Sequence, residues 1–296
     1  MEDFYINITS QYKSYNHSNI TSHYDHYEYY EKVYFITRVV TCIIISIGLP
    51  LTLVAICALC SLVRNDHVVP IYVINLHVSD LIQFCCMIVQ VAEWKSRNYW
   101  TSLIFYYIYI YCLNTSVYFM MCVALERYLV IACPLWYRCR RSIKTSVVVC
   151  VVVWVLPLVF LLTLFFLDKT DEVSKISFAV VLLLPLPLFI FFLGGTLKAL
   201  SASISVSSDE KRRIVRTLVL VLLIYTLLFL PAIIWLLAKG ARNNDNFRNL
   251  YVMFEKLSPL ADLVLYVFLR KGTTDQLLAS VCCCRMDSND VSISTV

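Results

Sequence analysis

Seven long apolar stretches, separated by short polar segments, run through this sequence. They cover about residues 34–63, 69–93, 100–131, 147–167, 176–200, 214–238 and 250–269. Each is long enough to cross about 30 Å of hydrocarbon as a helix, and lipid gives an unpaired backbone N–H or C=O no hydrogen-bond partner. The strands of a membrane barrel would be shorter and would alternate in polarity. The pattern therefore predicts an all-α membrane protein, a seven-transmembrane helix bundle.

The composition favours the same fold, because 60% of the 296 residues are hydrophobic and only 15% are charged. Soluble domains are about 45–50% apolar and about 25% charged. We expect a tail at residues 1–33, the helical domain at residues 34–269 and a second tail at residues 270–296. The first tail has no apolar segment that could act as a secretory signal, so the first span should serve as its own insertion signal.

Basic residues indicate the orientation, because cytoplasmic loops carry an excess of Lys and Arg. They follow the third, fifth and seventh stretches as Arg138, Arg140, Arg141 and Lys144, as Lys211, Arg212, Arg213 and Arg216, and as Arg270, Lys271 and Arg285. Such loops also attract anionic membrane lipid. The sequence therefore places the N-terminus outside and the C-terminal tail inside, in a multi-pass protein of the plasma membrane.

The 13 cysteines avoid the N-terminal tail and the loops assigned to the outside. An extracellular disulfide is therefore not expected. No group of Cys and His has the spacing of metal ligands either. The N-terminal tail does carry N-glycosylation sequons, which support its extracellular assignment. Their acceptor residues are Asn7, Asn16 and Asn19.

Charged residues inside the apolar stretches are costly to bury and usually functional. The short list of candidates is Asp80, Glu126, Arg127, Glu255, Lys256 and Asp262. In these residues, and in their order along the chain, the sequence resembles the rhodopsin-like (class A) G-protein-coupled receptors over all seven stretches. The motifs that carry the resemblance are Asn75-Leu76 with Asp80, Glu126-Arg127-Tyr128, Trp154, Phe229 with Pro231, and Asp262 to Tyr266.

The sequence departs from that family's pattern at several positions. Leu263 replaces the proline of the span-seven motif, and Pro259, one turn earlier, is a candidate for the bend. Ser102 stands near the usual cysteine of span three, an omission that occurs in lipid-sensing and Mas-related branches. The segment Tyr225 to Pro231 is similar to fish orphan receptors that are grouped with the proton-sensing branch. That branch uses an acidic residue of span four where this chain has Pro157.

The resemblance implies a receptor, not an enzyme, that passes an extracellular signal to a heterotrimeric G protein. Its coupling latch would comprise Glu126, Arg127, Tyr128 and Tyr266. The guanidinium of Arg127 would hold Glu126 in the inactive state and turn to the G protein in the active one, since a fork of several donors suits an exchange of partners. An outward swing of span six about Pro231, with Phe229 as its aromatic switch, would open the cytoplasmic side.

Resemblance further suggests that Asp80 and Asp262 face each other, with Ser116 and Ser258 nearby. Two carboxylates and two hydroxyls suit a sodium ion, the only metal we expect. Repulsion between the carboxylates also favours protonation of one of them, so a proton site is an alternative.

The ligand cavity should lie between the outer halves of the helices. Its expected residues are Tyr106, Tyr109, Leu113, Glu255 and Lys256. No carboxylate stands at position 109, which argues against a monoamine as the extracellular ligand, whose identity is unknown. No organic cofactor and no nucleic-acid partner is expected.

The C-terminal tail has features that suggest modification and partners. Cys282, Cys283 and Cys284 follow a short amphipathic cytoplasmic helix that we expect after span seven, and they are candidates for palmitoylation. The hydroxyl side chains beyond them are candidate sites for receptor kinases and arrestin. The chain ends in Ser294-Thr-Val296, which resembles a PDZ ligand.

Alternative functions remain. The chain could be a proton- or lipid-responsive orphan receptor. A retinal-binding opsin is a second alternative, because Lys256 lies where opsins carry the retinal lysine, although span three offers no counterion carboxylate. A transporter or channel would need broken helices, and Gly194-Gly195 is the only candidate break.

Overall fold

The computed structural model describes residues 31–61, 71–92, 99–133, 143–167, 171–202, 208–242 and 244–269. The chain divides into two compact units, residues 1–43 and 44–296. In the first unit the described residues belong to the helix Glu31–Ser61, which continues into the second. The second unit holds all the other described helices.

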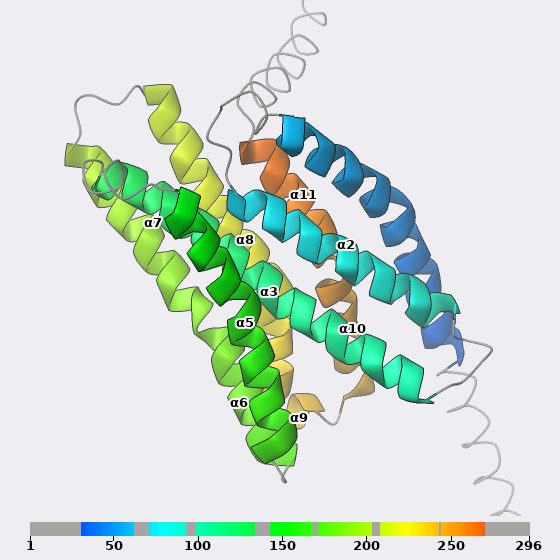
Figure 1. Cartoon of the computed structure of the whole chain (residues 1–296). Helices are drawn as coiled ribbons and strands as arrows, with labels where there is room; N and C mark the ends of the chain where they lie inside the picture. The colour runs from blue at the N-terminus through cyan, green and yellow to red at the C-terminus, as the bar shows by residue number, and fades with distance from the viewer. Residues whose placement is uncertain are drawn as a thin grey trace, which may run out of the picture. The chain divides into compact units, whose positions relative to one another are not determined.

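The described elements are all helices (Figure 1). After Glu31–Ser61 they are α2 (Ile71–Ala92), α3 (Tyr99–Ala132), α5 (Ile143–Leu167), α6 (Asp171–Leu183), α7 (Pro185–Ala202), α8 (Ser208–Leu237), α9 (Lys239–Arg242), α10 (Asp245–Lys256) and α11 (Ser258–Leu269). Six helical segments among the described residues are long and apolar enough to cross a membrane, and one of them, Lys175–Ser201, joins most of α6 to α7. Span seven consists of α10 and α11, each of 12 residues, so neither is long enough alone. The predicted all-α, seven-span bundle is confirmed.

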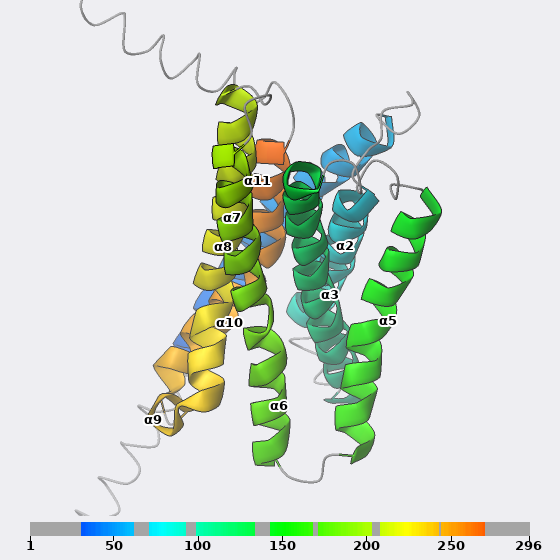
Figure 2. The same ribbon diagram turned by 90° about the vertical axis from the view of Figure 1, so that its left-hand side faces the viewer.

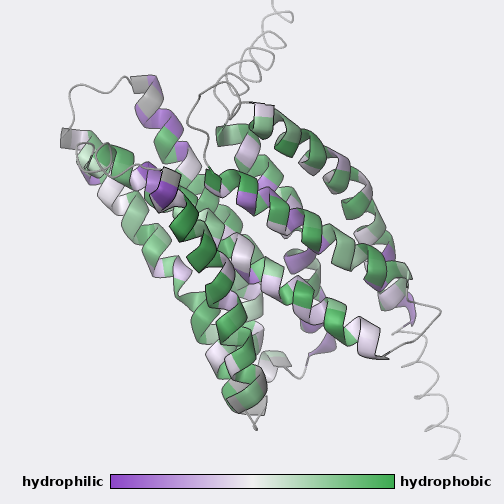
Figure 3. Ribbon diagram, in the orientation of Figure 1, coloured by the Kyte–Doolittle hydropathy of each residue, from purple (hydrophilic) through white to green (hydrophobic). Residues whose placement is uncertain are grey.

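Apolar side chains cover the outside of the helices, as a lipid environment requires (Figure 3). Val148 of α5 is 62% exposed, and Leu223 and Leu227 of α8 are each 61% exposed. Several polar side chains are instead fully buried, among them Asp80, Gln83 and Asp262. This distribution is the reverse of that in a soluble protein, because the solvent around the spans is apolar.

Helix α3 is the centre of the second unit, since α2, α5, α7 and α8 all pack against it (Figure 2). Two hydrogen bonds connect α2, α3 and α5. Trp154 Nε1 of α5 donates to Asn75 Oδ1 of α2 at 3.0 Å, and the Tyr111 hydroxyl of α3 donates to the Trp154 carbonyl at 2.7 Å. Phe119 of α3 packs edge-on against the same indole, with ring centroids 5.8 Å apart. The motif residues Asn75 and Trp154 therefore fix the positions of α2 and α5 around α3.

Span five is not the continuous helix that the apolar stretch predicted. It is interrupted at Leu184, where α6 ends and α7 begins at Pro185. Proline has no N–H to continue the hydrogen-bond ladder, so a helix commonly restarts at this residue. The prediction that Gly194-Gly195 would be the candidate break is wrong, because both glycines lie inside the regular helix α7.

Span seven is interrupted as well, at Leu257, two residues before Pro259. The Leu257 N–H donates to the Phe254 carbonyl at 3.0 Å, a tightened last turn that ends α10. Pro259 then occupies the first turn of α11, where its missing N–H costs no helical bond. Span seven is therefore interrupted two residues before Pro259, close to the position where the sequence suggested a bend.

We predict that the bond between Trp154 and Asn75 stabilises the bundle. Trp154→Phe keeps an aromatic ring beside Phe119 but removes the donor, so it should lower the free energy of unfolding by about 1 kcal/mol. A double-mutant cycle with Asn75→Ala, measured by thermal unfolding in detergent, should give a coupling of about 0.6 kcal/mol. Additive effects of the two substitutions would contradict this role.

Candidate functional site

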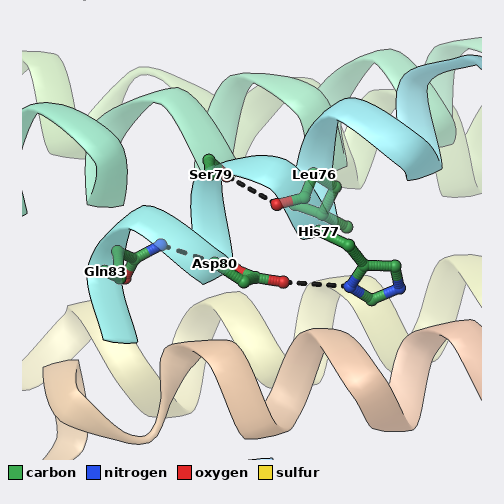
Figure 4. Close-up of polar contacts among 5 residues, drawn as sticks. All are labelled: Leu76, His77, Ser79, Asp80 and Gln83. Atoms are coloured by element: carbon green, nitrogen blue, oxygen red, sulfur yellow. Dashed lines mark hydrogen bonds and ion pairs between the residues drawn. The ribbon is translucent and has the colours of Figure 1, made fainter. Parts of the chain in front are cut away.

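A buried polar centre surrounds Asp80 in the middle of α2 (Figure 4). The Asp80 side chain is fully buried, and its Oδ2 lies 3.0 Å from Nδ1 of His77. Gln83 Nε2 donates to the other carboxyl oxygen at 3.4 Å. The three residues share one face of α2, because residues three apart are neighbours on a helix. This face is directed towards α11, which packs against α2.

Asp262 of α11 lies opposite and is also fully buried. Its carboxyl group is close enough to Asp80 and His77 to interact electrostatically with both. The structure thus brings the Asp80 and Asp262 carboxyl groups close enough to share a proton, and no other described donor reaches the Asp262 oxygens or the Ser258 hydroxyl.

Ser116 of α3 is buried too, and its hydroxyl donates to the Leu113 carbonyl at 2.8 Å. The oxygen therefore keeps its lone pairs, which could still accept a bond or ligate an ion. Among the described residues, no group of three or more His, Cys, Asp or Glu side chains could hold a metal ion by itself, so a cation here would also need hydroxyl or other oxygen ligands. Oxygen ligands of this kind suit a hard, small cation.

Sequence reasoning missed His77 and Gln83 as members of this centre. The signal was available, because both lie three residues from Asp80 and hence on its face of the helix. His77 also meets Tyr266 of α11 edge-on, with ring centroids 5.5 Å apart. It therefore connects the buried carboxylates to one of the residues expected to take part in coupling.

The motif Glu126-Arg127-Tyr128 lies near the end of α3. Glu126 is 9% exposed, and Arg127 and Tyr128 are half-buried. The Tyr128 ring packs against Phe191 and Phe192 of α7, with centroids 5.7 Å away in each case. Tyr266, on α11, packs instead beside the apolar cluster of Leu59, Val73 and Val123.

A glycine of α7 makes room for the Tyr128 ring. A Cβ atom at Gly195 would lie 2.6 Å from Tyr128 Cε2, far inside van der Waals contact. At Gly194, one residue earlier, a Cβ atom would meet nothing within 4 Å. The absence of a side chain at Gly195 therefore has a packing reason, and α3 and α7 interlock at this point.

An aromatic stack lies one turn before Pro231 in α8. Phe229 is fully buried, and its ring stacks on Tyr225 with centroids 5.0 Å apart. Phe189 of α7 packs on the other side of Tyr225 at 5.2 Å. The Tyr225 hydroxyl donates to the Leu182 carbonyl in the last turn of α6. One tyrosine thus joins α8 to both halves of the interrupted span five.

The residues expected in the ligand cavity lie on α3 and α10. Tyr109 and Leu113 are 4% and 2% exposed, whereas Tyr106 is 51% exposed. Glu255 of α10 is buried, and it lies within electrostatic range of Tyr106 and Tyr109. Lys256 is half-buried. The structure therefore buries Glu255, Tyr109 and Leu113 and leaves Tyr106 exposed.

Other predicted sites lie outside the described residues. They are the sequons at Asn7, Asn16 and Asn19, the cysteines Cys282, Cys283 and Cys284, and the terminal motif at residues 294–296. Cys86, Cys112 and Cys150 are among the free thiols of the described helices.

Comparison with known proteins identifies the family of this chain. The profile of the 7 transmembrane receptor (rhodopsin family) matches residues 51–266. The chain therefore belongs to the rhodopsin family of seven-transmembrane receptors, as its motifs indicated. It is a multi-pass protein of the plasma membrane, and its family consists of receptors, not enzymes.

Relatives from two groups of receptors show similar identities. The mouse Mas-related G-protein coupled receptor member A8 is 29% identical over 57% of this chain, a region that spans 58% of that receptor. Member A4 from mouse is 27% identical over 69% of this chain and 71% of its own length. The mouse G-protein coupled receptor 68 is 24% identical over 71% of this chain and 66% of its own. The family rests on the profile match, and the Mas-related receptors and G-protein coupled receptor 68 are similar to this chain to nearly the same degree.

The two glycines of α7 provide a matched test of the packing around Tyr128. Gly195→Ala should destabilise the protein by about 1–3 kcal/mol, because the added methyl displaces a ring held between α3 and α7. Gly194→Ala gains the same helix propensity without the clash and should be neutral or slightly stabilising. Melting temperatures in detergent measure both. Equal effects would show that Tyr128 moves aside freely.

Proposed function

We propose that this chain is a receptor that relays an extracellular signal to a heterotrimeric G protein. The observation that carries the proposal is Glu126-Arg127-Tyr128, which lies near the end of α3, where Tyr128 packs against α7. Arg127 is half-buried there, with its Nε among the buried atoms. Its planar fork of donors suits bonds to carboxylates or backbone carbonyls of a protein partner.

The distribution of basic residues supports a cytoplasmic assignment for this end of the bundle. Lys211 of α8 donates to the Leu200 carbonyl in the last turn of α7 at 3.1 Å. Arg212 and Arg216 on the same turns of α8 are exposed. Cytoplasmic ends of spans carry such an excess of positive charge. This orientation places the N-terminal tail, with its sequons, outside the cell.

In this proposal, activation moves the cytoplasmic end of α8, which begins at Ser208, outward. Pro231 lies inside α8 and breaks its hydrogen-bond ladder, which gives the helix a point of bending. The stack of Tyr225 and Phe229 lies just before this point and contacts α7, so a ligand-driven change in that stack would alter the angle of α8. The ligand acts because it binds the open state better than the closed one.

We further propose that Asp80 and Asp262, together with Ser258, hold a cation between α2 and α11. Two adjacent buried carboxylates repel each other, and their charge must be compensated by a metal ion or a proton. The unpartnered oxygens of Asp262 and Ser258 support a small ion with oxygen ligands. Bound sodium would supply that compensating charge, and His77 and Gln83 would hold the Asp80 carboxylate in place.

Arg127→Ala tests the receptor function. In cells, the wild type should dissociate a G protein on stimulation, and the variant should lose this response because the contact surface lacks its guanidinium. The assay should span external pH 6 to 8, since protons are one candidate stimulus. Arg212→Ala, which removes an exposed arginine near the same end, serves as the control. A variant that retains the full response at normal surface expression would refute the proposed role of Arg127.

Asp262→Asn tests the cation site. The purified wild type should melt at a higher temperature in sodium chloride than in potassium chloride of equal ionic strength, and the variant should lose this difference. Asp245→Asn, at an exposed carboxylate of α10, should behave like the wild type. Stability that varies with pH but not with the salt would identify a proton as the compensating charge. Insensitivity to both would contradict a cation at this centre.

A further inference from the structure

Two cysteines lie on the outer surface of the helix Glu31–Ser61, close to the end of that helix. Cys57 and Cys60 are both exposed. They are three residues apart, so their side chains are neighbours on the surface of the helix. Neither belongs to the coupling motif or to the carboxylate centre, and their thiols have no part in the sites described above.

The other side of this helix packs into the bundle and fixes the direction of the thiols. Ala55 and Leu59 are 2% and 4% exposed, and Leu59 forms an apolar cluster with Val73 of α2 and Val123 of α3. Cys57 lies two residues from each of the buried positions 55 and 59. Two residues along a helix turn the side chain by about 200°. The Cys57 thiol is therefore directed away from the bundle, towards the surrounding lipid.

The surface that continues from Cys57 into the span is apolar. Leu53 and Val54 lie one turn before Cys57 and are 47% and 65% exposed. A hydrocarbon chain attached to the sulfur would lie along these two side chains, parallel to the lipid tails. The outer face of the helix thus offers both a nucleophilic atom and a matching apolar surface beside it.

The depth of the pair differs from that of another exposed cysteine. The helix ends at Ser61, so Cys57 lies roughly 6 Å from its end at a rise of 1.5 Å per residue. Arg64 follows in sequence, and basic residues are typical of the cytoplasmic boundary of a span. Cys85 is also exposed, but it lies within α2, roughly 21 Å from the first residue of that helix. The pair is thus within reach of the interface, and Cys85 is not.

We propose that the Cys57–Cys60 pair accepts a long-chain fatty acyl group as a thioester at the cytoplasmic boundary of span one. Juxtamembrane cysteines are positions at which reversible S-acylation occurs. This site is separate from the cysteines of the C-terminal tail, which follow span seven. The inference rests on the orientation in the proposed function, which places this end of the helix inside the cell.

The modification exchanges one thioester for another. The donor is a long-chain acyl-coenzyme A, and the cysteine thiolate attacks its carbonyl carbon. The new carbon–sulfur bond forms as the bond to the coenzyme A sulfur breaks, and the proton lost by the cysteine ends on the released thiol. No oxidant or reductant is required. A disulfide between the two cysteines is disfavoured instead, because the cytoplasm keeps thiols reduced.

Acyl–PEG exchange on the full-length receptor expressed in cells tests the site. Free thiols are blocked, hydroxylamine cleaves thioesters, and each thiol released in this way gains one polyethylene glycol label that shifts the protein in a gel. Cys57→Ser combined with Cys60→Ser should remove one label from the wild-type ladder. Cys85→Ser should remove none, because its thiol lies too deep in the membrane. A double variant that keeps the complete wild-type ladder would overturn the proposal.

Other thiols at this end of the bundle do not confuse the result. Cys133, which is exposed directly after α3, and the tail cysteines remain in every variant, so any labels that they carry form a constant background.

Mass spectrometry of the unsubstituted receptor gives a second measurement, which does not depend on the folding of a variant. The peptide that contains Cys57 and Cys60 should carry the mass of a fatty acyl chain, and hydroxylamine should remove it. The peptide that contains Cys85 should carry none. A peptide found only with unmodified Cys57 and Cys60 would show that both residues merely fill a lipid-facing surface, and it would overturn the proposal.

Failure of this inference can be distinguished from failure of the proposed function. If the N-terminal tail is outside the cell, peptide N-glycosidase should lower the apparent mass of the wild type. An unacylated pair in a glycosylated receptor would overturn the acylation site alone. An unacylated pair in an unglycosylated receptor would contradict the orientation as well. The coupling assay with Arg127→Ala leaves both cysteines in place, so its outcome stands apart from either result.

Discussion

Lipid gives a polar side chain neither a hydrogen-bond partner nor a counter-charge, and the interior of this bundle is arranged around that constraint. Polar groups that leave the interface must find each other across helices. The indole of Trp154 meets Asn75, and the hydroxyl of Tyr225 meets a carbonyl of α6. Asp80 meets His77 and Gln83 on its own helix. Where the protein itself offers no partner, as at Asp262, a bound ion is the natural complement.

Prolines and one glycine decide where the helices depart from regularity. Pro185 and Pro259 each follow an interruption, and the carbonyls freed there become available to side chains from other helices. Tyr225 uses one of them and so links α8 to span five at its weakest point. Gly195 has the opposite effect, because it lets the Tyr128 ring lie flush against a continuous α7.

Span seven contributes residues to several of the candidate sites. Glu255 lies before the interruption at Leu257, while Ser258, Asp262 and Tyr266 follow it. His77 touches both Asp80 and Tyr266, so it offers a physical route from the carboxylate centre to the coupling end. The common element of these sites is therefore one interrupted helix.

The sequence by itself determined the membrane fold, because seven apolar stretches longer than a bilayer's hydrocarbon core admit few other structures. Its motifs also determined the family, and the buried charges could be picked out by their cost in lipid. What it could not determine was which groups meet across helices. The edge contact between His77 and Tyr266 joins the second span to the seventh, and the packing of Tyr128 on Gly195 depends on how α3 and α7 cross. Such contacts follow from helix rotation and the exact sites of interruption, and only packing of the whole bundle fixes these. The structure therefore decided where the charges have partners and where they need a ligand.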